Sequence, residues 1–247
     1  MTRAIILTSQ RSGSTLLVSS LQSHPELLCR GELLIAGMGM PTPRMLENSR
    51  HAFKVVRFFW TGAWHSTRTM RRFYAVSGPR THVFKAMYNH LAAPWTRDWL
   101  VRQNDIRVIH LQRRNLLKQY VSYLLMGRRR DKRGWLPNTT EPVAPLRIRV
   151  SPDKAIRYFR RMQDTYPRFA DLFREHDVLP LVYEDMVDAE QIATGTAEQL
   201  CDFLQVSRRP LTTPYIKINP ESLRDIVINY DELSATLRPT EFAAFLD

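Results

Sequence analysis

The stretch that decides the fold is Ala4–Leu17, AIILTSQRSGSTLL. An apolar run, Ile5 to Leu7, is followed by the polar segment Ser9–Thr15 and then by leucine and valine residues at helical spacing. This order predicts a buried strand, a tight loop and a helix. Because the first N–H groups of a helix lack intrahelical partners and carry partial positive charge, a loop placed there is suited to bind an anion.

The residue types in this loop fit a phosphate or sulfate group. Gly13 lets the backbone approach a ligand, and Arg11 brings a fixed positive charge. Hydroxyl donors come from three neighbours, Ser12, Ser14 and Thr15. Serine and threonine are also favoured at the start of any helix, so an ordinary capped helix after a turn is the alternative interpretation.

The loop departs from the nucleoside-triphosphate P-loop, G-x-x-x-x-G-K-[ST]. Its leading glycine position holds Leu7 or Thr8, and its lysine position holds Ser14. Phosphate transfer from ATP with a P-loop lysine is therefore disfavoured, and a small-molecule kinase of this type is kept as an alternative function.

The loop resembles the 5′-phosphosulfate loop of sulfotransferases that use 3′-phosphoadenosine 5′-phosphosulfate (PAPS), especially the bacterial carbohydrate-type branch, which carries R-S-G-S-T. The resemblance extends over nearly the whole chain. It implies one sulfotransferase domain over residues 1–247, with an α/β three-layer fold and a mostly parallel central sheet. It also implies PAPS as sulfuryl donor, no metal, and a hydroxylated acceptor such as a glycan, a glycolipid or another metabolite. Arg11 to Thr15 would bind the donor.

A second motif lies in the middle of the chain. Residues 106–111 alternate as a strand, and Arg113-Arg114-Asn115 lead into a helix with an apolar stripe. The family pairs an arginine before asparagine with a serine eight residues later. By resemblance, Arg114 and Ser122 would bind the 3′-phosphate, with Arg113 as an alternative ligand. The other interpretation is a helix after a basic turn, with Ser122 facing solvent.

Two charged residues near strand ends are candidates for the chemistry. Glu32 ends a short predicted strand, and the carboxyl end of a second parallel strand is expected beside the first loop. The resemblance implies that Glu32 is the general base, for which a modestly raised pKa is suitable. It also implies that Lys85, in the predicted strand 81–87, lies near the transferred group. Both residues are otherwise read as exposed charges, and His90 does not fit the K-x-H spacing of cytosolic members.

The remaining segments carry weaker signals. Residues 36–77 are expected to be rich in loops, and their aromatic patch, with His65, fits an acceptor pocket or a core. Residues 127–150, with the basic run 128–133, are expected to form a surface or lid loop that contributes nothing to a core. Residues 222–237 predict one amphipathic helix. The Y-E-D-M tract, 183–186, resembles a structural tract in which Glu184 or Asp185 caps a helix or orients an arginine.

Composition limits the function further. The chain has 247 residues, with 36 Lys and Arg against 24 Asp and Glu, a formal charge of +12. An arginine-rich excess favours an oxyanion ligand. A non-catalytic nucleic-acid or polyanion-binding protein is the alternative, but nucleic acid is not expected because the arginines are dispersed.

The sequence also bears on compartment and assembly. Cys29 and Cys201 show no metal or disulfide spacing. No apolar run approaches the roughly 18 residues of a membrane span, and the first strand begins too early for a signal peptide. We therefore expect a cytoplasmic protein. The apolar stripes fit a core or a partner, so a homodimer is an open possibility.

Overall fold

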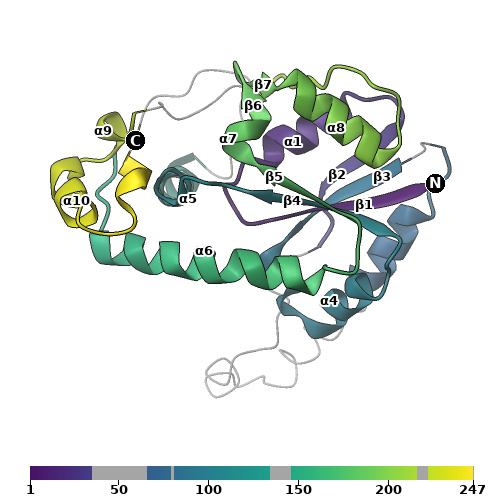
Figure 1. Ribbon diagram of the computed structural model, residues 1–247, viewed down its shortest axis with the longest axis horizontal. Coiled ribbons are helices and arrows are strands. Elements are labelled where there is room, and N and C mark those ends of the chain that lie inside the picture. Colours follow the sequence, from purple (N-terminus) through teal and green to yellow (C-terminus); the bar gives the residue numbers. More distant parts are fainter. Residues whose placement is uncertain (35–65, 79–80, 134–145, 216–221, 247) are drawn as a thin grey trace.

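The computed structural model describes residues 1–34, 66–78, 81–133, 146–215 and 222–246. These residues form a central five-stranded sheet, entirely parallel, in the order β2-β3-β1-β4-β5. The strands are β1 (Thr2–Thr8), β2 (Leu27–Glu32), β3 (Thr81–Met87), β4 (Ile106–Gln112) and β5 (Val178–Val182). Helices cover both faces of the sheet (Figure 1). The predicted α/β three-layer fold is confirmed.

The central strand β1 shows why the sheet is buried on both sides. Its residues Ala4 to Leu7 are fully buried. Ile5 and Leu7 belong to one hydrophobic cluster, whereas Ala4 and Ile6 belong to the other. Since successive side chains of a strand point to opposite faces, a continuous apolar run is what a doubly covered parallel strand requires.

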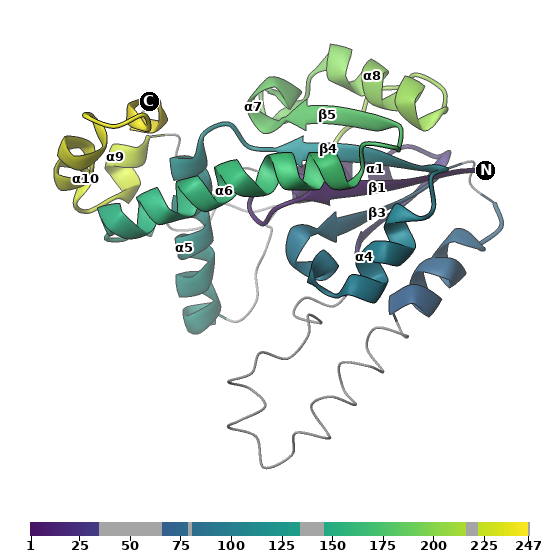
Figure 2. The ribbon, with the colours of Figure 1, turned by 60° about the horizontal axis from the view of Figure 1, so that its bottom comes forward.

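Two helical layers complete the core. One face of the sheet packs against α1 (Ser14–Gln22) and α8 (Thr194–Leu204). The other packs against a helix over 66–74, α4 (Pro94–Val101) and α6 (Pro152–Leu172) (Figure 2).

Cys29 and Cys201 are free and buried, and burial raises the pKa of the Cys29 thiol to about 12. None of the described helices has the combination of length and apolar character needed to cross a bilayer.

The strand order places the site. From β1 the chain passes through α1 to the edge strand β2, whereas from β4 it passes through α5 (Leu116–Arg133) and α6 to the opposite edge, β5. The loops after the adjacent strands β1 and β4 therefore leave in opposite directions, which opens a crevice at their carboxyl ends. The end of β2 does not lie beside the first loop as expected, because β3 is inserted between them.

Two sequence expectations about loops are wrong. Residues 66–74, within the stretch expected to be rich in loops, form a helix, while the aromatic patch and His65 lie outside the described residues. The surface loop expected over 127–150 is wrong at both ends. Its first seven residues continue helix α5, and at its other end Ile148 and Val150 are buried in the core, at 1% and 0% exposure. Residues 134–145 lie outside the described part.

The single helix expected over 222–237 is divided in two. α9 (Leu223–Ile226) and α10 (Tyr230–Leu237) are separated because residues 146–150 pair with the backbone between them. Ile148 N–H donates to Ile226 O at 2.9 Å, and Ile228 N–H donates to Ile148 O at 2.8 Å. The Asn229 side chain bonds both backbone groups of Val150 at 2.9 Å. Long-range pairing thus replaces helical bonds at the junction.

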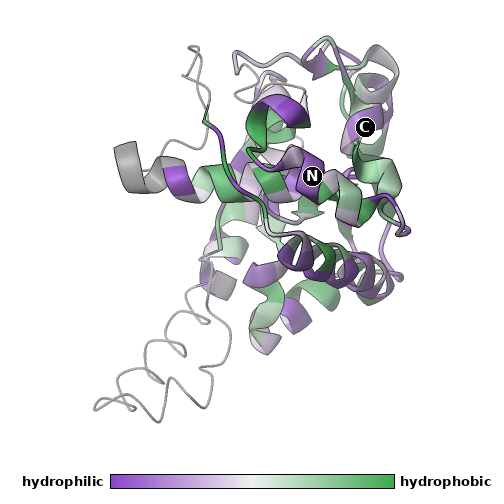
Figure 3. Ribbon diagram, turned by 90° about the vertical axis from the view of Figure 1, so that its left-hand side faces the viewer, coloured by the Kyte–Doolittle hydropathy of each residue, from purple (hydrophilic) through white to green (hydrophobic). Residues whose placement is uncertain are grey.

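The C-terminal helices and the remaining short elements border the site end of the sheet. Figure 3 faces this end and shows helices that mix hydrophilic and hydrophobic residues, as helices with one face on a core do. The short elements are η1 (Tyr88–Ala92), α7 (Tyr183–Met186), β6 (Val187–Asp188), β7 (Gln191–Ile192) and η2 (Ala243–Leu246).

Candidate active site

The loop between β1 and α1 has the backbone shape of an anion-binding turn. Arg11 and Gly13 both adopt left-handed conformations, with φ of 60° and 89°, and Gly13 is the N-cap of α1. Successive N–H groups in such a turn converge on a concave site. The Ser12 hydroxyl is used inside the loop, where it donates to Ser9 O at 2.9 Å. Ser12 is therefore placed to hold the loop together by its side chain and to offer a ligand only its backbone N–H.

Gly13 is required for a reason that the sequence did not show. A Cβ built at this position would lie 2.1 Å from Cδ2 of Tyr183, the first residue of α7. The Arg113 guanidinium in turn lies 4.8 Å from the centroid of the same ring. The absence of a side chain at Gly13 therefore makes room for the Tyr183 ring. That ring in turn contacts Arg113, which follows the adjacent strand β4.

The structure brings the loop after β1 into contact with Ser122, one of the two residues predicted to bind the 3′-phosphate. Arg11 Nε donates to Ser122 Oγ at 3.0 Å, across 111 residues of sequence. Arg113 Nη1 donates to Arg11 O at 3.2 Å. Ser122 is buried, so it does not face solvent. The loop after β1 and the first turns of α5 therefore form one continuous basic site.

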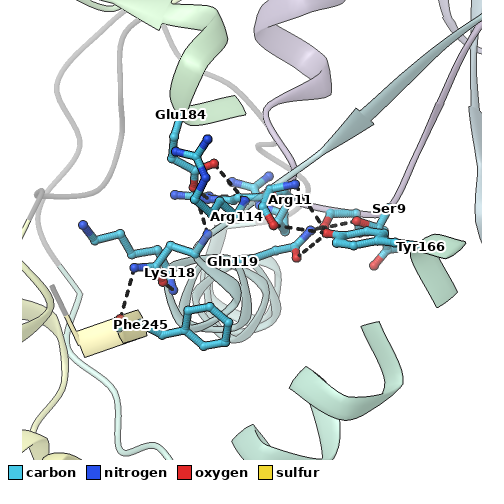
Figure 4. Close-up of polar contacts among 11 residues, drawn as sticks. Ser9, Arg11, Arg114, Lys118, Gln119, Tyr166, Glu184 and Phe245 are labelled. Carbon is cyan, nitrogen blue, oxygen red and sulfur yellow. Dashed lines mark hydrogen bonds and ion pairs between the residues drawn. The ribbon is translucent and has the colours of Figure 1, made fainter. Parts of the chain in front are cut away.

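The adjacent arginines 113 and 114 point in different directions. Arg113 is largely buried and lies 3.6 Å from Glu184, whereas Arg114 is exposed and pairs with Asp185 at 2.5 Å. The Glu184 carboxylate also accepts the backbone N–H of Arg114 at 2.8 Å and of Asn115 at 3.1 Å, at the start of α5 (Figure 4). A carboxylate is stabilised at this end of a helix. The structural roles predicted for Glu184 and Asp185 are confirmed.

A buried polar network beneath the loop involves a residue that sequence reasoning missed. The Gln119 amide donates to Ser9 Oγ at 2.7 Å and to Gln10 O at 2.9 Å. Tyr166 of α6 donates to Gln119 Oε1 at 3.3 Å, and Figure 4 shows the three side chains side by side. Gln119 is fully buried beside the apolar stripe of α5, and local periodicity does not show this because the burial comes from contacts with Ser9 and Gln10, about 110 residues away.

Glu32 lies in a separate charged cluster at the ends of β2 and β3. Lys85 Nζ is 2.9 Å from Glu32 Oε1, and His90 Nε2 is 3.6 Å from Glu32 Oε2. The Met87 N–H donates to His90 Nδ1, which leaves the ring proton on Nε2, facing Glu32. The expected rise in pKa is wrong: hydrogen bonding to His90, and then to Lys85, lowers the pKa of Glu32 to about 2.

Two cavities border these groups. One, of about 790 Å³, lies between η1, α4, α5 and α6 and reaches Ser9 and Gln10 of the loop. The other, of about 540 Å³, lies between the first turn of α5 and the C-terminal helices. Its lining includes three basic residues, Lys118, Arg224 and Arg238. Among the described residues, no group of three His, Cys, Asp or Glu side chains is arranged to hold a metal ion.

Comparison with known proteins identifies the fold. No protein-family model matches the sequence, and no curated protein matches it. Among solved structures, the chain is similar to a sulfotransferase from Alicyclobacillus acidocaldarius, with a TM-score of 0.52 and 17% identity over all of this chain and 94% of the other. The sulfotransferase domain of the Synechococcus PCC 7002 olefin synthase matches at a TM-score of 0.45 and 22% identity, over 88% of this chain and 78% of that one. The chain therefore has a fold in common with the Alicyclobacillus sulfotransferase.

Proposed function

We propose that this chain, which has the fold of a sulfotransferase, transfers a sulfuryl group from PAPS to a hydroxyl group of a small molecule, glycan or glycolipid. The products are a sulfate ester and adenosine 3′,5′-bisphosphate. The observation that supports this best is the hydrogen bond from Arg11 to Ser122, because it joins the loop after β1 to the start of α5. A ligand with phosphate groups at two ends fits a site built from two such donor clusters.

In this proposal the loop after β1 binds the 5′-phosphosulfate. The backbone N–H groups of residues 12–15 and the guanidinium of Arg11 bind its oxygens. The acceptor oxygen forms a bond to sulfur while the bond from sulfur to the 5′-phosphate oxygen breaks. Negative charge develops on that leaving oxygen, where Arg11 and Lys85 stabilise it. Arginines and N–H groups neutralise this charge, so we assign no metal to the reaction.

Glu32 takes the proton of the acceptor hydroxyl. It is ionised at neutral pH, and its pKa is lowered further by hydrogen bonding to His90 and by the ion pair with Lys85. When Lys85 turns towards the leaving oxygen, Glu32 loses a counter-ion and its pKa rises. The carboxylate thus becomes a stronger base at the stage when the proton is released.

The 3′-phosphate is assigned to the second donor cluster. Ser122 supplies a hydroxyl, and Arg114 supplies a guanidinium after exchanging Asp185 for the phosphate. Arg113 is nearer to the loop, since it contacts Arg11, and we include it as a ligand. The cavity of about 540 Å³ beside Lys118 adds positive charge on this side, which favours the doubly phosphorylated nucleotide.

Calorimetric titration with adenosine 3′,5′-bisphosphate tests the donor assignment. We expect binding at least tenfold tighter than that of adenosine 5′-phosphate, and a loss of about tenfold or more in Arg11→Gln. Arg102→Gln is the matched control, because Arg102 is exposed at the end of α4, which leads into the amino end of β4, whereas the site lies at the carboxyl ends of the strands. Incubation with ³⁵S-labelled PAPS and acceptor mixtures then tests transfer. Equal affinity for both nucleotides would contradict the proposal.

The alternatives give different results in the same experiments. Phosphate transfer from ATP that requires Mg²⁺ would indicate a kinase. Oligonucleotide binding that falls steeply with salt, without affinity for adenosine 3′,5′-bisphosphate, would indicate a nucleic-acid-binding protein.

A further inference from the structure

The cavity of about 790 Å³ has an apolar, aromatic body. η1 contributes Tyr88 and Leu91, α5 contributes Tyr123, and α6 contributes Tyr158 and Phe169. The rings are fixed by one another: Tyr88 stacks on Phe169 with centroids 4.2 Å apart and an angle of 15° between the ring planes. A volume of this size is typical of sites for small organic ligands. The walls are therefore suited to a flat or extended apolar group.

Among its described lining residues, the same cavity carries two arginines that have no carboxylate partner. Arg161 and Arg168 lie two turns apart on α6 and both line the cavity. Within the described part of the chain, neither has an ion-pair partner. The two carboxylates among the described lining residues are already paired, Asp98 with Arg97 at 2.8 Å and Asp171 with Arg174 at 3.1 Å. Two guanidinium groups therefore remain for an anionic ligand.

The cavity is connected to the proposed chemistry through η1. This five-residue turn carries Tyr88 and Leu91 on the cavity wall and His90 against Glu32. Ser9 and Gln10, which precede the anion-binding turn, line the cavity as well. A molecule bound in the cavity would thus have one end beside the loop after β1 and another along α6.

We propose that this cavity binds the acceptor, and that the acceptor is a hydroxylated molecule with an apolar or aromatic body and a carboxylate or similar anionic group. The hydroxyl lies towards Ser9 and η1, the apolar body lies against Tyr88 and Phe169, and the anionic group pairs with Arg161 and Arg168. The identification of this ligand as the acceptor rests on the proposed function. A neutral glycan would leave both guanidinium groups without a counter-ion.

Two naphthalene probes test the assignment by direct binding. The first is 6-(hydroxymethyl)-2-naphthoate, and the second carries a methyl group in place of the carboxylate. Binding is followed by the fluorescence of the naphthalene, without any donor. We expect the carboxylate probe to bind about tenfold more tightly, which corresponds to the contribution of one charge-assisted pair, ~1.4 kcal/mol. Arg161→Gln and Arg168→Gln should reduce that preference, and the double variant should abolish it.

Arg160→Gln is the matched control. Arg160 is an exposed arginine of the same helix that does not line the cavity, so its replacement changes the net charge equally without changing the preference. Equal affinity for the two probes, or an equal loss in Arg160→Gln, would overturn the inference. Selective binding without any transfer from labelled PAPS would contradict the proposed function and leave the ligand class of the cavity supported. Binding of adenosine 3′,5′-bisphosphate, with transfer to neutral hydroxyl compounds alone, would support the proposed function and overturn the inference about an anionic ligand in the cavity.

Discussion

Replacing Gly13 with alanine should destabilise the protein through two separate effects. The φ of 89° is a left-handed conformation, which costs a residue with a Cβ ~1 to 2 kcal/mol. The new Cβ would also lie 2.1 Å from Cδ2 of Tyr183, so the ring must move. Its displacement weakens the contact with the Arg113 guanidinium, worth ~0.5 to 1 kcal/mol, and adds packing strain of ~1 kcal/mol.

The sum is a loss of ~3 kcal/mol in the free energy of unfolding. For a chain of this length, that loss lowers the melting temperature by ~6 to 12 °C. Urea unfolding followed by circular dichroism measures the free energy, and calorimetry measures the midpoint. Gly127→Ala is the control of opposite sign, because Gly127 lies in α5 with no atom within 4 Å of a built Cβ. It should stabilise the protein by ~0.4 to 1 kcal/mol.

A double-mutant cycle separates the two effects. In a Tyr183→Ala background the clash is absent, so Gly13→Ala should cost only the conformational ~1 to 2 kcal/mol, and the coupling between the two sites should be ~1 to 2 kcal/mol. If Gly13→Ala unfolded at the urea concentration of the wild type, or if the cycle gave no coupling, the reasoning about this loop would be refuted.

Three further predictions concern charge, buried hydrogen bonds and the C-terminal helices. The pKa of Glu32 is about 2 in the folded protein and 4.5 ordinarily, so its contribution to stability is present above pH 4.5 and lost as the pH falls towards 2. Urea titrations should therefore show this loss for the wild type but not for Glu32→Gln. Gln119→Leu leaves the Ser9 hydroxyl and the Gln10 carbonyl without their buried partner and should cost ~1 to 3 kcal/mol in urea unfolding; an unchanged midpoint would contradict the network. Asn229→Ala removes two buried hydrogen bonds and should cost ~2 kcal/mol, detectable by hydrogen exchange as faster opening of residues 148–150.

Local patterns sufficed for much of the fold. The run from Ile5 to Leu7 predicted β1, and the polar loop followed by leucines predicted α1, because both depend on short-range periodicity and burial. The strands β3 and β4 were predicted for the same reason. The sequence also contained a signal for the buried segment 146–150, since LRIRV alternates apolar and charged residues as a strand does. The basic residues and prolines that precede this segment favour a loop, and they led to the expectation of a loop over the whole stretch.

Tertiary contacts determined what the sequence could not show. α9 and α10 are separated because residue 148 pairs with the backbone of residues 226 and 228, a contact across about 80 residues. Which of two adjacent arginines turns inward depends on the positions of Glu184 and Asp185. The spacing of His90 from Lys85 does not predict a role for it, but the tight turn of η1 brings His90 to Glu32.

The three residues that begin α7 place a constraint on anyone who would engineer this protein. Tyr183 fills the space above Gly13, Glu184 accepts the leading N–H groups of α5, and Asp185 pairs with Arg114. A graft of the R-S-G-S-T loop into another scaffold would need a tyrosine supplied from the end of a non-adjacent strand. The transplantable unit is thus a loop together with a tripeptide about 170 residues away.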